Sequence, residues 1–245
     1  MKIPYVEILR SASEDARTDT DPYADLPVWA QDIADTKHQL LNKLQQNLVL
    51  LAAIEGVDVP HSKVHHAFVF AALRHQDQLR KDDATPYIFH NIRILDLYLN
   101  NLASQDLLPE QIVDGACAVF LHDVVEDCGV TYKDLAMEFG DIVTELVFWL
   151  SEEEKERCGN RRLRKKLAAQ KIACAPELAK FIKVLDIFDN SYCCGEFFTP
   201  TFFELFHLEK KEMLEGIIGS ENSATRNIAY NLWVLCRERL SGLSL

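Results

Sequence analysis

The sequence predicts an all-α protein, and three observations support this fold class. Apolar residues recur at helical spacing in most segments of the 245-residue chain, whereas the alternating pattern of strands is scarce. Gly and Pro, which interrupt helices, number only 9 and 8. The 48% hydrophobic content is enough for one substantial core, and no internal repeat is visible. We therefore expect a single helical domain over residues 28–245.

The N-terminal part of the sequence predicts a polar leader followed by two helices. Residues 1–27 are polar and weakly patterned, which is typical of a leader without regular structure. A first helix is expected over residues 32–54, where leucines recur at helical spacing, and Gly56 supplies its stop. A second helix begins after Ser62, a suitable N-cap, and continues to about Leu79.

Two further helices are expected in the middle of the chain, each opened by a proline. Pro86 suits the first turn of a helix that continues to Leu99 and carries His90 near its beginning. Pro109 opens the next helix, which runs into a charged cluster at His122.

The C-terminal half predicts four helical segments. Thr131 caps a helix that continues to Leu150, and Pro176 opens another. Two more helical patterns follow, over residues 201–218 and 223–240.

Composition argues against several classes of protein. A net charge of -12 disfavours broad binding to nucleic acid, which depends on many cations. No apolar run approaches the roughly 18 residues of a membrane span, and the N-terminus lacks the core of a signal peptide. The 7 cysteines show no CxxC spacing, which argues against a disulfide framework. We expect a cytoplasmic protein that binds neither nucleic acid nor membranes.

The most informative stretch is residues 121–127, which follows an apolar helical run. It holds one histidine, His122, and three carboxylates, Asp123, Glu126 and Asp127. On a helix the four side chains project within about half of the circumference, because they form two pairs four residues apart. Buried charges normally persist only when they are paired or bound to a metal. The stretch therefore indicates a metal site with acid or base groups beside it, at the end or interruption of a buried helix.

His90 and Asp186 are the candidates for the remaining ligands. His90 lies at a helix start, and Asp186 interrupts the apolar run of residues 182–190. On its own, an aspartate on an apolar helix is more often a hydrogen-bonded core residue. Together with His122 and Asp123 it suits a metal ligand. Two imidazoles and two carboxylates fit manganese, iron or zinc, with positions left for water or substrate.

Glu126 and Asp127 lie one turn beyond the candidate ligands. There they can take a proton from water or protonate a leaving phosphate oxygen. Alternatively, both are surface acids near a helix end, and Asp127 caps the helix or pairs with Lys133. The sequence has no glycine-rich phosphate loop, no GxSxG motif and no Cys–His pair with a plausible orienting group. Metal-assisted hydrolysis is therefore the leading chemistry.

Residues 161–166 place five cations in six positions, after the acidic run 152–154. The basic run is either a solvated helix face balanced by nearby acids or a site for a small, multiply phosphorylated ligand. The remaining histidines lack comparable acidic neighbours and are interpreted as surface or core residues: His38, His61, His65, His66, His75 and His207.

With these motifs the chain resembles the HD-domain hydrolases, and more narrowly the RelA/SpoT-type hydrolases that degrade guanosine tetra- and pentaphosphate. The resemblance spans about residues 67–190, and an ordered set of motifs carries it: residues 75–81, 85–90, 122–127, 164–167 and 183–186 with Asn190. It implies an HD-domain helical bundle with additional N- and C-terminal helices. Because the chain stops at Leu245, without room for a synthetase domain, it resembles the small alarmone hydrolases that include the metazoan SpoT homologue.

The resemblance also implies roles for individual residues. One metal ion, usually manganese, would have four ligands: His90, His122, Asp123 and Asp186. Two acids would activate water: Glu126 and Asp127. Arg80 and Lys81 would contact the guanine base, and Asn190 would contact the nucleoside. The phosphates would be bound by three cations: Arg164, Lys165 and Lys166. The implied reaction removes the 3′-diphosphate of the guanine nucleotide as pyrophosphate and leaves GDP or GTP.

Some positions depart from the family pattern. Asn91 replaces a common proline, which we expect to alter only the stiffness of the helix start. Ile187 replaces a basic residue, residues 82–84 replace a glycine-containing turn, and residues 148–151 lack a typical Thr-Lys pair. An HD phosphatase of another nucleotide or of a 3′-phosphorylated cofactor therefore stays open. A non-catalytic nucleotide sensor or interaction module is a third hypothesis, against which the intact ligands and acids argue.

Overall fold

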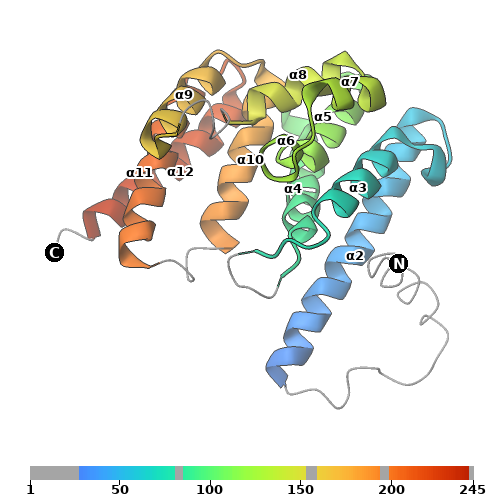
Figure 1. Ribbon diagram of the computed structural model, residues 1–245, viewed down its shortest axis with the longest axis horizontal. Coiled ribbons are helices and arrows are strands. Elements are labelled where there is room, and N and C mark those ends of the chain that lie inside the picture. The colour runs from blue at the N-terminus through green and yellow to red at the C-terminus, as the bar shows by residue number, and fades with distance from the viewer. Residues whose placement is uncertain (1–27, 81–84, 153–158, 194–198, 243–245) are drawn as a thin grey trace.

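Helices make up the regular structure of the described residues. The computed structural model describes residues 28–80, 85–152, 159–193 and 199–242 (Figure 1). Within these ranges the one other element is an isolated antiparallel bridge between Leu79 and Pro86. The all-α fold class is therefore confirmed, whereas the predicted leader, residues 1–27, lies outside the described residues. None of the described helices is both long and apolar enough to cross a membrane.

The N-terminal helices follow the predicted order, with one shorter than expected. They are α2 (Val28–Glu55), the 3-10 helix η2 (Val59–His61), α3 (Lys63–Arg74), α4 (Ile88–Asn100) and the 3-10 helix η3 (Leu102–Ser104). Ser62 is the predicted N-cap of α3, and its hydroxyl accepts a hydrogen bond from the His65 N–H. The prediction that this helix reaches Leu79 is wrong. The segment after it instead pairs with the residues just before α4, because the Arg80 N–H donates to the Thr85 carbonyl at 2.7 Å.

The middle of the chain contains two interruptions that position the site. Its helices are α5 (Pro109–Leu121), α6 (Val124–Cys128), α7 (Tyr132–Phe139) and α8 (Asp141–Leu150). Thr131 caps α7 as predicted, but the single helix expected as far as Leu150 is divided at Gly140. Gly140 has a φ of 81°, a conformation that glycine adopts readily and that a continuous helix does not contain. His122 and Asp123 likewise separate α5 from α6, so the prediction that this stretch ends or interrupts a buried helix is confirmed.

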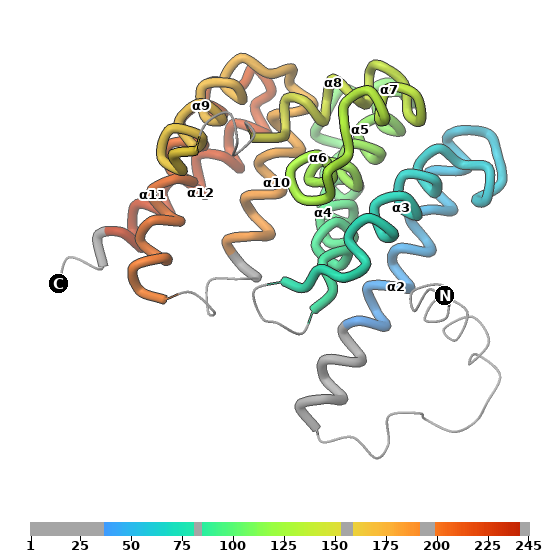
Figure 2. The backbone as a smooth tube through the Cα atoms, in the orientation of Figure 1, coloured from blue at the N-terminus to red at the C-terminus, as the bar shows by residue number. Residues whose placement is uncertain are grey.

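Three of the four C-terminal helices within the described residues agree closely with the prediction, and the other covers the basic run of residues 161–166. They are α9 (Arg161–Ala173), α10 (Glu177–Cys193), α11 (Pro200–Ile217) and α12 (Ser223–Gly242). Helix α11 packs against both α9 and α12, and α10 contacts α4 and α8 as well as α11 and α12. Figure 2 shows α10 between these C-terminal helices and the α4–α6 part of the molecule. Helix α10 thus joins two parts of the chain that are distant in sequence.

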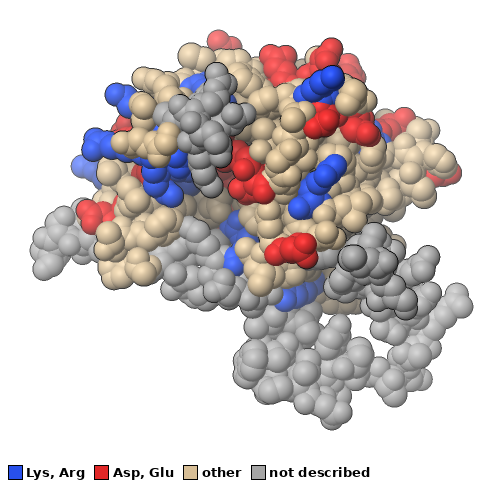
Figure 3. Space-filling view, viewed as in Figure 1, with Lys and Arg blue, Asp and Glu red and all other residues tan. Residues whose placement is uncertain are grey.

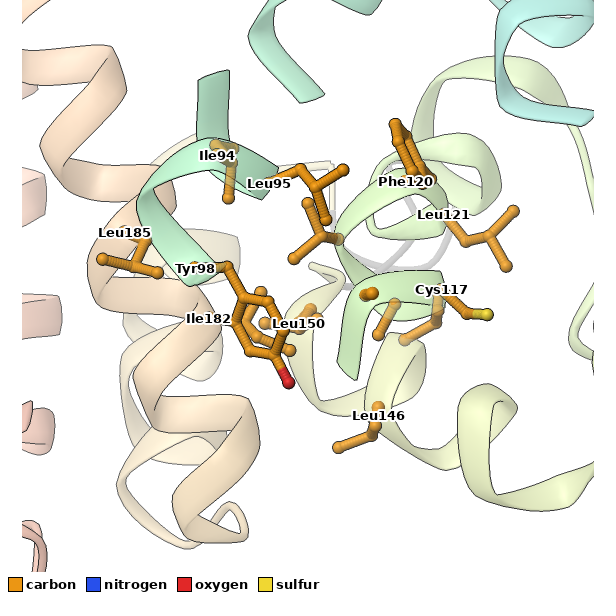
Figure 4. Packing of buried hydrophobic residues seen from close by; sticks show 14 of the residues in the cluster. Ile94, Leu95, Tyr98, Cys117, Phe120, Leu121, Leu146, Leu150, Ile182 and Leu185 are labelled. Atoms are coloured by element: carbon orange, nitrogen blue, oxygen red, sulfur yellow. The ribbon is translucent and has the colours of Figure 1, made fainter. Parts of the chain in front are cut away.

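One hydrophobic core extends through the helices and ends beside the charged residues. Side chains from three helices lie together in Figure 4: Ile94, Leu95 and Tyr98 of α4, Phe120 and Leu121 of α5, and Ile182 and Leu185 of α10. The three candidate ligands His90, His122 and Asp186 lie on or directly after these same helices. Core packing therefore determines how the ligands approach one another.

Candidate active site

His90, His122 and Asp186 form a buried group that could hold a metal ion. One ligand atom from each residue lies within 4.8 Å of the other two, and all three residues are buried. The Nε2 atom of His90 lies 3.3 Å from Asp186 Oδ1, and the Nε2 atom of His122 lies 4.0 Å from the same oxygen. Three of the four predicted ligands thus converge.

Both imidazoles are oriented with their Nε2 atoms toward the centre of this group. The Nδ1 atom of His90 lies 2.7 Å from Asp189 Oδ2, and that of His122 lies 2.9 Å from the Val119 carbonyl oxygen. Because a carboxylate and a carbonyl accept hydrogen bonds, each Nδ1 carries the donated proton. Both Nε2 atoms are buried, and neither makes a well-aligned hydrogen bond within the described residues, although Asp186 Oδ1 lies 3.3 Å from that of His90 and Asp123 Oδ2 lies 2.8 Å from that of His122. A metal ion would satisfy both atoms at once.

Charge in the site also favours a cation. Burial opposes the charged form of His122, but the carboxylates of Asp123 and Asp186 outweigh this effect and raise the pKa of His122 to about 9. The carboxylates therefore stabilise positive charge at this position, and a bound divalent cation would supply it in place of the proton.

Asp123, the fourth predicted ligand, lies at the edge of the buried group. Its Oδ2 atom is 2.8 Å from His122 Nε2 and accepts a hydrogen bond from the Tyr87 hydroxyl. The His75 ring stacks on Tyr87, with 4.5 Å between ring centroids, and is itself 2% exposed. His75 is therefore a buried histidine, as one of the two interpretations allowed, and it supports the tyrosine that contacts Asp123.

Asp189 contacts the Nδ1 atom of His90, Arg93 contacts Asp189, and the sequence analysis assigned a role to neither. The guanidinium of Arg93 donates two hydrogen bonds to the Asp189 carboxylate, at 2.6 and 2.9 Å. Hydrogen bonds from His90 and Arg93 hold the pKa of Asp189 well below its usual range, against the effect of burial. The available signal was spacing, because Asp189 and Arg93 each lie three residues after a candidate ligand and so on the same helix face.

Lys183 is a third residue to which the sequence motifs assigned no role. Its buried ammonium lies 2.9 Å from Asp186 Oδ2 and donates to the Leu150 carbonyl at 3.2 Å. Burial opposes its charge, but Asp186, Glu126 and Asp123 outweigh burial and raise its pKa. Lys183 thus balances part of the negative charge of the site.

Glu126 and Asp127 lie on α6 beside the buried group. The Glu126 side chain is exposed overall, but the protein atoms around its carboxyl group disfavour the charged form, and together with the nearby charges of Asp123 and Glu152 they raise its pKa to about 7. Its Oε1 atom accepts a hydrogen bond from the Glu152 N–H at 2.6 Å. Asp127 is exposed, and its backbone carbonyl accepts from Gln78 at 3.1 Å. Of the two predicted acids, Glu126 therefore has a pKa suited to proton transfer near neutral pH.

Arg80 and Asn190 lie together next to Asp186. The Arg80 guanidinium donates to Asn190 Oδ1 at 2.8 Å and lies over the Tyr87 ring, and the Asn190 amide donates to Asp186 Oδ1. The structure thus brings two predicted substrate contacts to the metal group. Lys81, the other residue predicted to contact the base, lies outside the described residues.

The basic run of α9 divides between the site and the surface. Lys165 forms an ion pair with Glu152, the residue that contacts Glu126. Arg164 donates to the Gly159 carbonyl at 3.3 Å, and Lys166 is exposed. Arg161 instead donates two hydrogen bonds to Glu209 of α11, at 2.7 and 2.8 Å. Arg161 thus fits the interpretation of a helix face balanced by nearby acids, and the phosphate-binding role of Arg164, Lys165 and Lys166 stays a prediction.

Two departures from the family pattern have structural explanations. Asn91 is fully buried, and its Nδ2 donates to the Phe120 carbonyl at 2.7 Å. The expectation that Asn91 affects only helix stiffness is therefore wrong, because it connects the start of α4 to the end of α5. Ile187 is buried in the core, so its apolar side chain follows from packing.

The fold and the site together define an HD-type arrangement, in which a His–Asp pair after one helix meets a histidine and an aspartate from two others. Comparisons with known proteins agree with this class. No family model matches the chain. It is 32% identical over 132 residues to the guanosine-3′,5′-bis(diphosphate) 3′-pyrophosphohydrolase MESH1 of Drosophila melanogaster, covering 54% of this chain and 69% of that protein.

The MESH1 protein of Xenopus tropicalis is 26% identical over 158 residues, which cover 62% of this chain and 83% of the relative. A solved structure, described as a metazoan ortholog of SpoT that hydrolyzes ppGpp, shares the fold with a TM-score of 0.60. It is 24% identical and covers 72% of this chain and 96% of its own. The chain belongs to the MESH1 family of guanosine-3′,5′-bis(diphosphate) 3′-pyrophosphohydrolases.

Proposed function

We propose that this chain is a metal-dependent pyrophosphohydrolase of guanosine tetraphosphate and pentaphosphate. The reaction removes the 3′-diphosphate and yields GDP or GTP with pyrophosphate. The observation that carries the proposal is the buried group of His90, His122 and Asp186, in which both Nε2 atoms lie close to carboxylate oxygens. Membership of the MESH1 family supports the choice of substrate, since the fly and frog relatives are named for this hydrolysis.

The proposed cofactor is one divalent cation, with manganese as the first choice. His90, His122 and Asp186 hold it, and Asp123 completes the set from the edge of the group. A donor set of imidazoles and carboxylates suits a first-row divalent metal. When bound, the cation polarises the phosphate and lowers the pKa of water.

Glu126 handles the proton of the reaction. With a pKa of about 7 it can accept a proton from water and then release it to the leaving oxygen. The water oxygen forms a bond to phosphorus while the bond between phosphorus and the ribose 3′-oxygen breaks. The proton ends on the 3′-oxygen, and Asp127 orients the water from the next position on α6.

The nucleotide is bound by residues on both sides of the metal group. Arg80, placed over Tyr87 and joined to Asn190, contacts the base and nucleoside together with Lys81. Lys165 contacts a phosphate from α9, and Arg164 and Lys166 extend the positive charge along that helix.

The test is hydrolysis by the purified chain. With manganese and guanosine tetraphosphate we expect GDP and pyrophosphate in equal amounts, measured by anion-exchange chromatography. Asp123→Asn should lose both metal and turnover, whereas Asp106→Asn, at an exposed position, should keep both. A wild-type chain that holds metal but forms no product would contradict the proposed substrate.

A substrate panel separates this proposal from the other HD phosphatase activities. It should include a 3′-phosphorylated adenine cofactor and nucleoside monophosphates. Preference for one of these by kcat/KM would replace the guanine nucleotide and keep the metal-dependent hydrolysis.

A further inference from the structure

Tyr87, the residue directly before α4, contacts two candidate metal ligands and an arginine predicted to bind the base. Its hydroxyl donates a hydrogen bond to Asp123 Oδ2. Its ring meets the His90 ring edge-on, with 5.6 Å between the ring centroids. The guanidinium carbon of Arg80 lies 5.5 Å from the centroid of the same tyrosine ring. Tyr87 therefore contacts both the metal group and the nucleotide-binding part of the site.

The position of Tyr87 is fixed by neighbours on both its backbone and its ring. The Tyr87 N–H donates to the Gln78 carbonyl at 2.9 Å. The buried His75 ring stacks on the tyrosine ring at an interplanar angle of 19°, and its own Nδ1 atom lies 2.7 Å from Gln78 Oε1. Gln78 in turn donates to the Asp127 carbonyl of α6 at 3.1 Å. The tyrosine hydroxyl is thus held in place relative to α6, the helix that Asp123 precedes.

Asp123 lacks the contact that usually orients an aspartate at a helix start. It is the N-cap residue of α6, but its side chain makes no capping hydrogen bond. An N-cap aspartate normally accepts from a backbone N–H of the first turn. Here its Oδ2 atom accepts from Tyr87 and lies 2.8 Å from His122 Nε2. Its side chain is 16% exposed, more than the 6% of Asp186, so packing restrains it less.

A rigid ring connects the part of the site that suits a cation with the part that suits an anion. On the face of the molecule that includes α6 and α10, acidic and basic side chains lie close together (Figure 3). The phenol oxygen and the ring of Tyr87 cannot move independently. The spacing between Asp123 and Arg80 therefore depends on one side chain, and catalysis requires such spacing to be precise.

We propose that Tyr87 is a positioning residue with two separable roles. Its hydroxyl orients Asp123 as a metal ligand, and its ring holds the Arg80 guanidinium for the nucleotide. A hydrogen bond to a ligating carboxylate fixes the orientation of that ligand, and a cation–π contact restrains a guanidinium group. The inference rests on the proposed function, although the role of the hydroxyl requires only the metal.

The first test measures manganese affinity by competition with a chelator, in the absence of nucleotide. Tyr87→Phe removes only the hydroxyl, and it should lower the affinity by about 10- to 100-fold. Tyr98→Phe is the matched control, because Tyr98 is buried on α4 and its hydroxyl donates to the Ile112 carbonyl at 3.2 Å within the core. The control should leave manganese affinity unchanged. The two variants should have similar melting temperatures.

The second test separates the ring from the hydroxyl by comparing Tyr87→Leu with Tyr87→Phe. Steady-state kinetics with guanosine tetraphosphate are measured at a manganese concentration that saturates each variant. Tyr87→Phe should lower kcat and leave KM unchanged. Tyr87→Leu should also raise KM by about threefold or more, because the Arg80 guanidinium loses its cation–π contact.

The outcomes distinguish this inference from the proposed function. Wild-type manganese affinity in Tyr87→Phe, or an equal loss in Tyr98→Phe, would overturn the role of the hydroxyl. A KM that is the same in Tyr87→Leu and Tyr87→Phe would overturn the role of the ring. If the wild type hydrolyses no guanosine tetraphosphate but Tyr87→Phe loses manganese affinity, the proposed substrate fails and the role of the hydroxyl stands.

Discussion

The two sides of the site are built in different ways. On the metal side each candidate ligand has a buried partner, as in the hydrogen bond between His90 and Asp189. On the basic side the cations come from helix surfaces, and Lys165 makes its ion pair with Glu152, an acid of the same site. The first side is positioned before any ligand arrives, whereas a phosphate must compete with an internal carboxylate on the second. Rigid positioning suits a metal, and exchangeable ion pairs suit a substrate that must leave.

The largest effect is expected on the metal side from Glu126→Gln. Loss of the group that accepts a proton should lower kcat by about 10²- to 10⁴-fold. In the wild type, activity should fall as pH drops below about 7, because Glu126 then becomes protonated and can no longer act as a base. The measurement is the pH dependence of kcat, with Glu138→Gln on α7 as the control. A normal rate in Glu126→Gln would remove this residue from proton transfer.

A smaller effect on the same side is expected from Asp189→Asn. The substitution weakens the acceptor that holds the His90 Nδ1 proton, and removal of such a partner typically lowers metal affinity by about 10- to 100-fold. Competition with a chelator would measure the manganese affinity. Asp96→Asn, which removes a 2.7 Å ion pair with Lys43 on the outer side of α4, should leave that affinity unchanged. Similar metal affinity in both variants would show that Asp189 has only a structural role.

Features that depend on residues close together in the sequence could be predicted from it. Helix starts at Ser62, Pro109 and Thr131 depend on neighbouring residues, and the structure has helices at all three. The metal group was predictable because its residues interrupt apolar helices. The division of one expected helix at Gly140 was not predictable. The apolar residues on both sides keep helical spacing, and the pattern does not reveal the positive φ of Gly140.

Residues that act through tertiary contacts were the ones missed. Arg93 looks like a surface cation in the sequence, and only the packing of α4 against α10 brings it to Asp189. Tyr87 belongs to a recognised motif, but its hydrogen bond to Asp123 depends on the turn before α4. The predicted leader, residues 1–27, stays a prediction.

The smallest expected effect is on the basic side, in Glu152→Gln. The Glu152 charge raises the pKa of Glu126, after the larger effects of burial and of Asp123. Its removal should therefore move the acid limb of the kcat profile modestly toward lower pH. The same change releases Lys165 from its ion pair, so pyrophosphate should bind more tightly. Glu145→Gln, at an exposed position on α8, is the matched control and should change neither quantity. Weaker pyrophosphate binding in Glu152→Gln would mean that this carboxylate positions Lys165 for the ligand instead of competing with it.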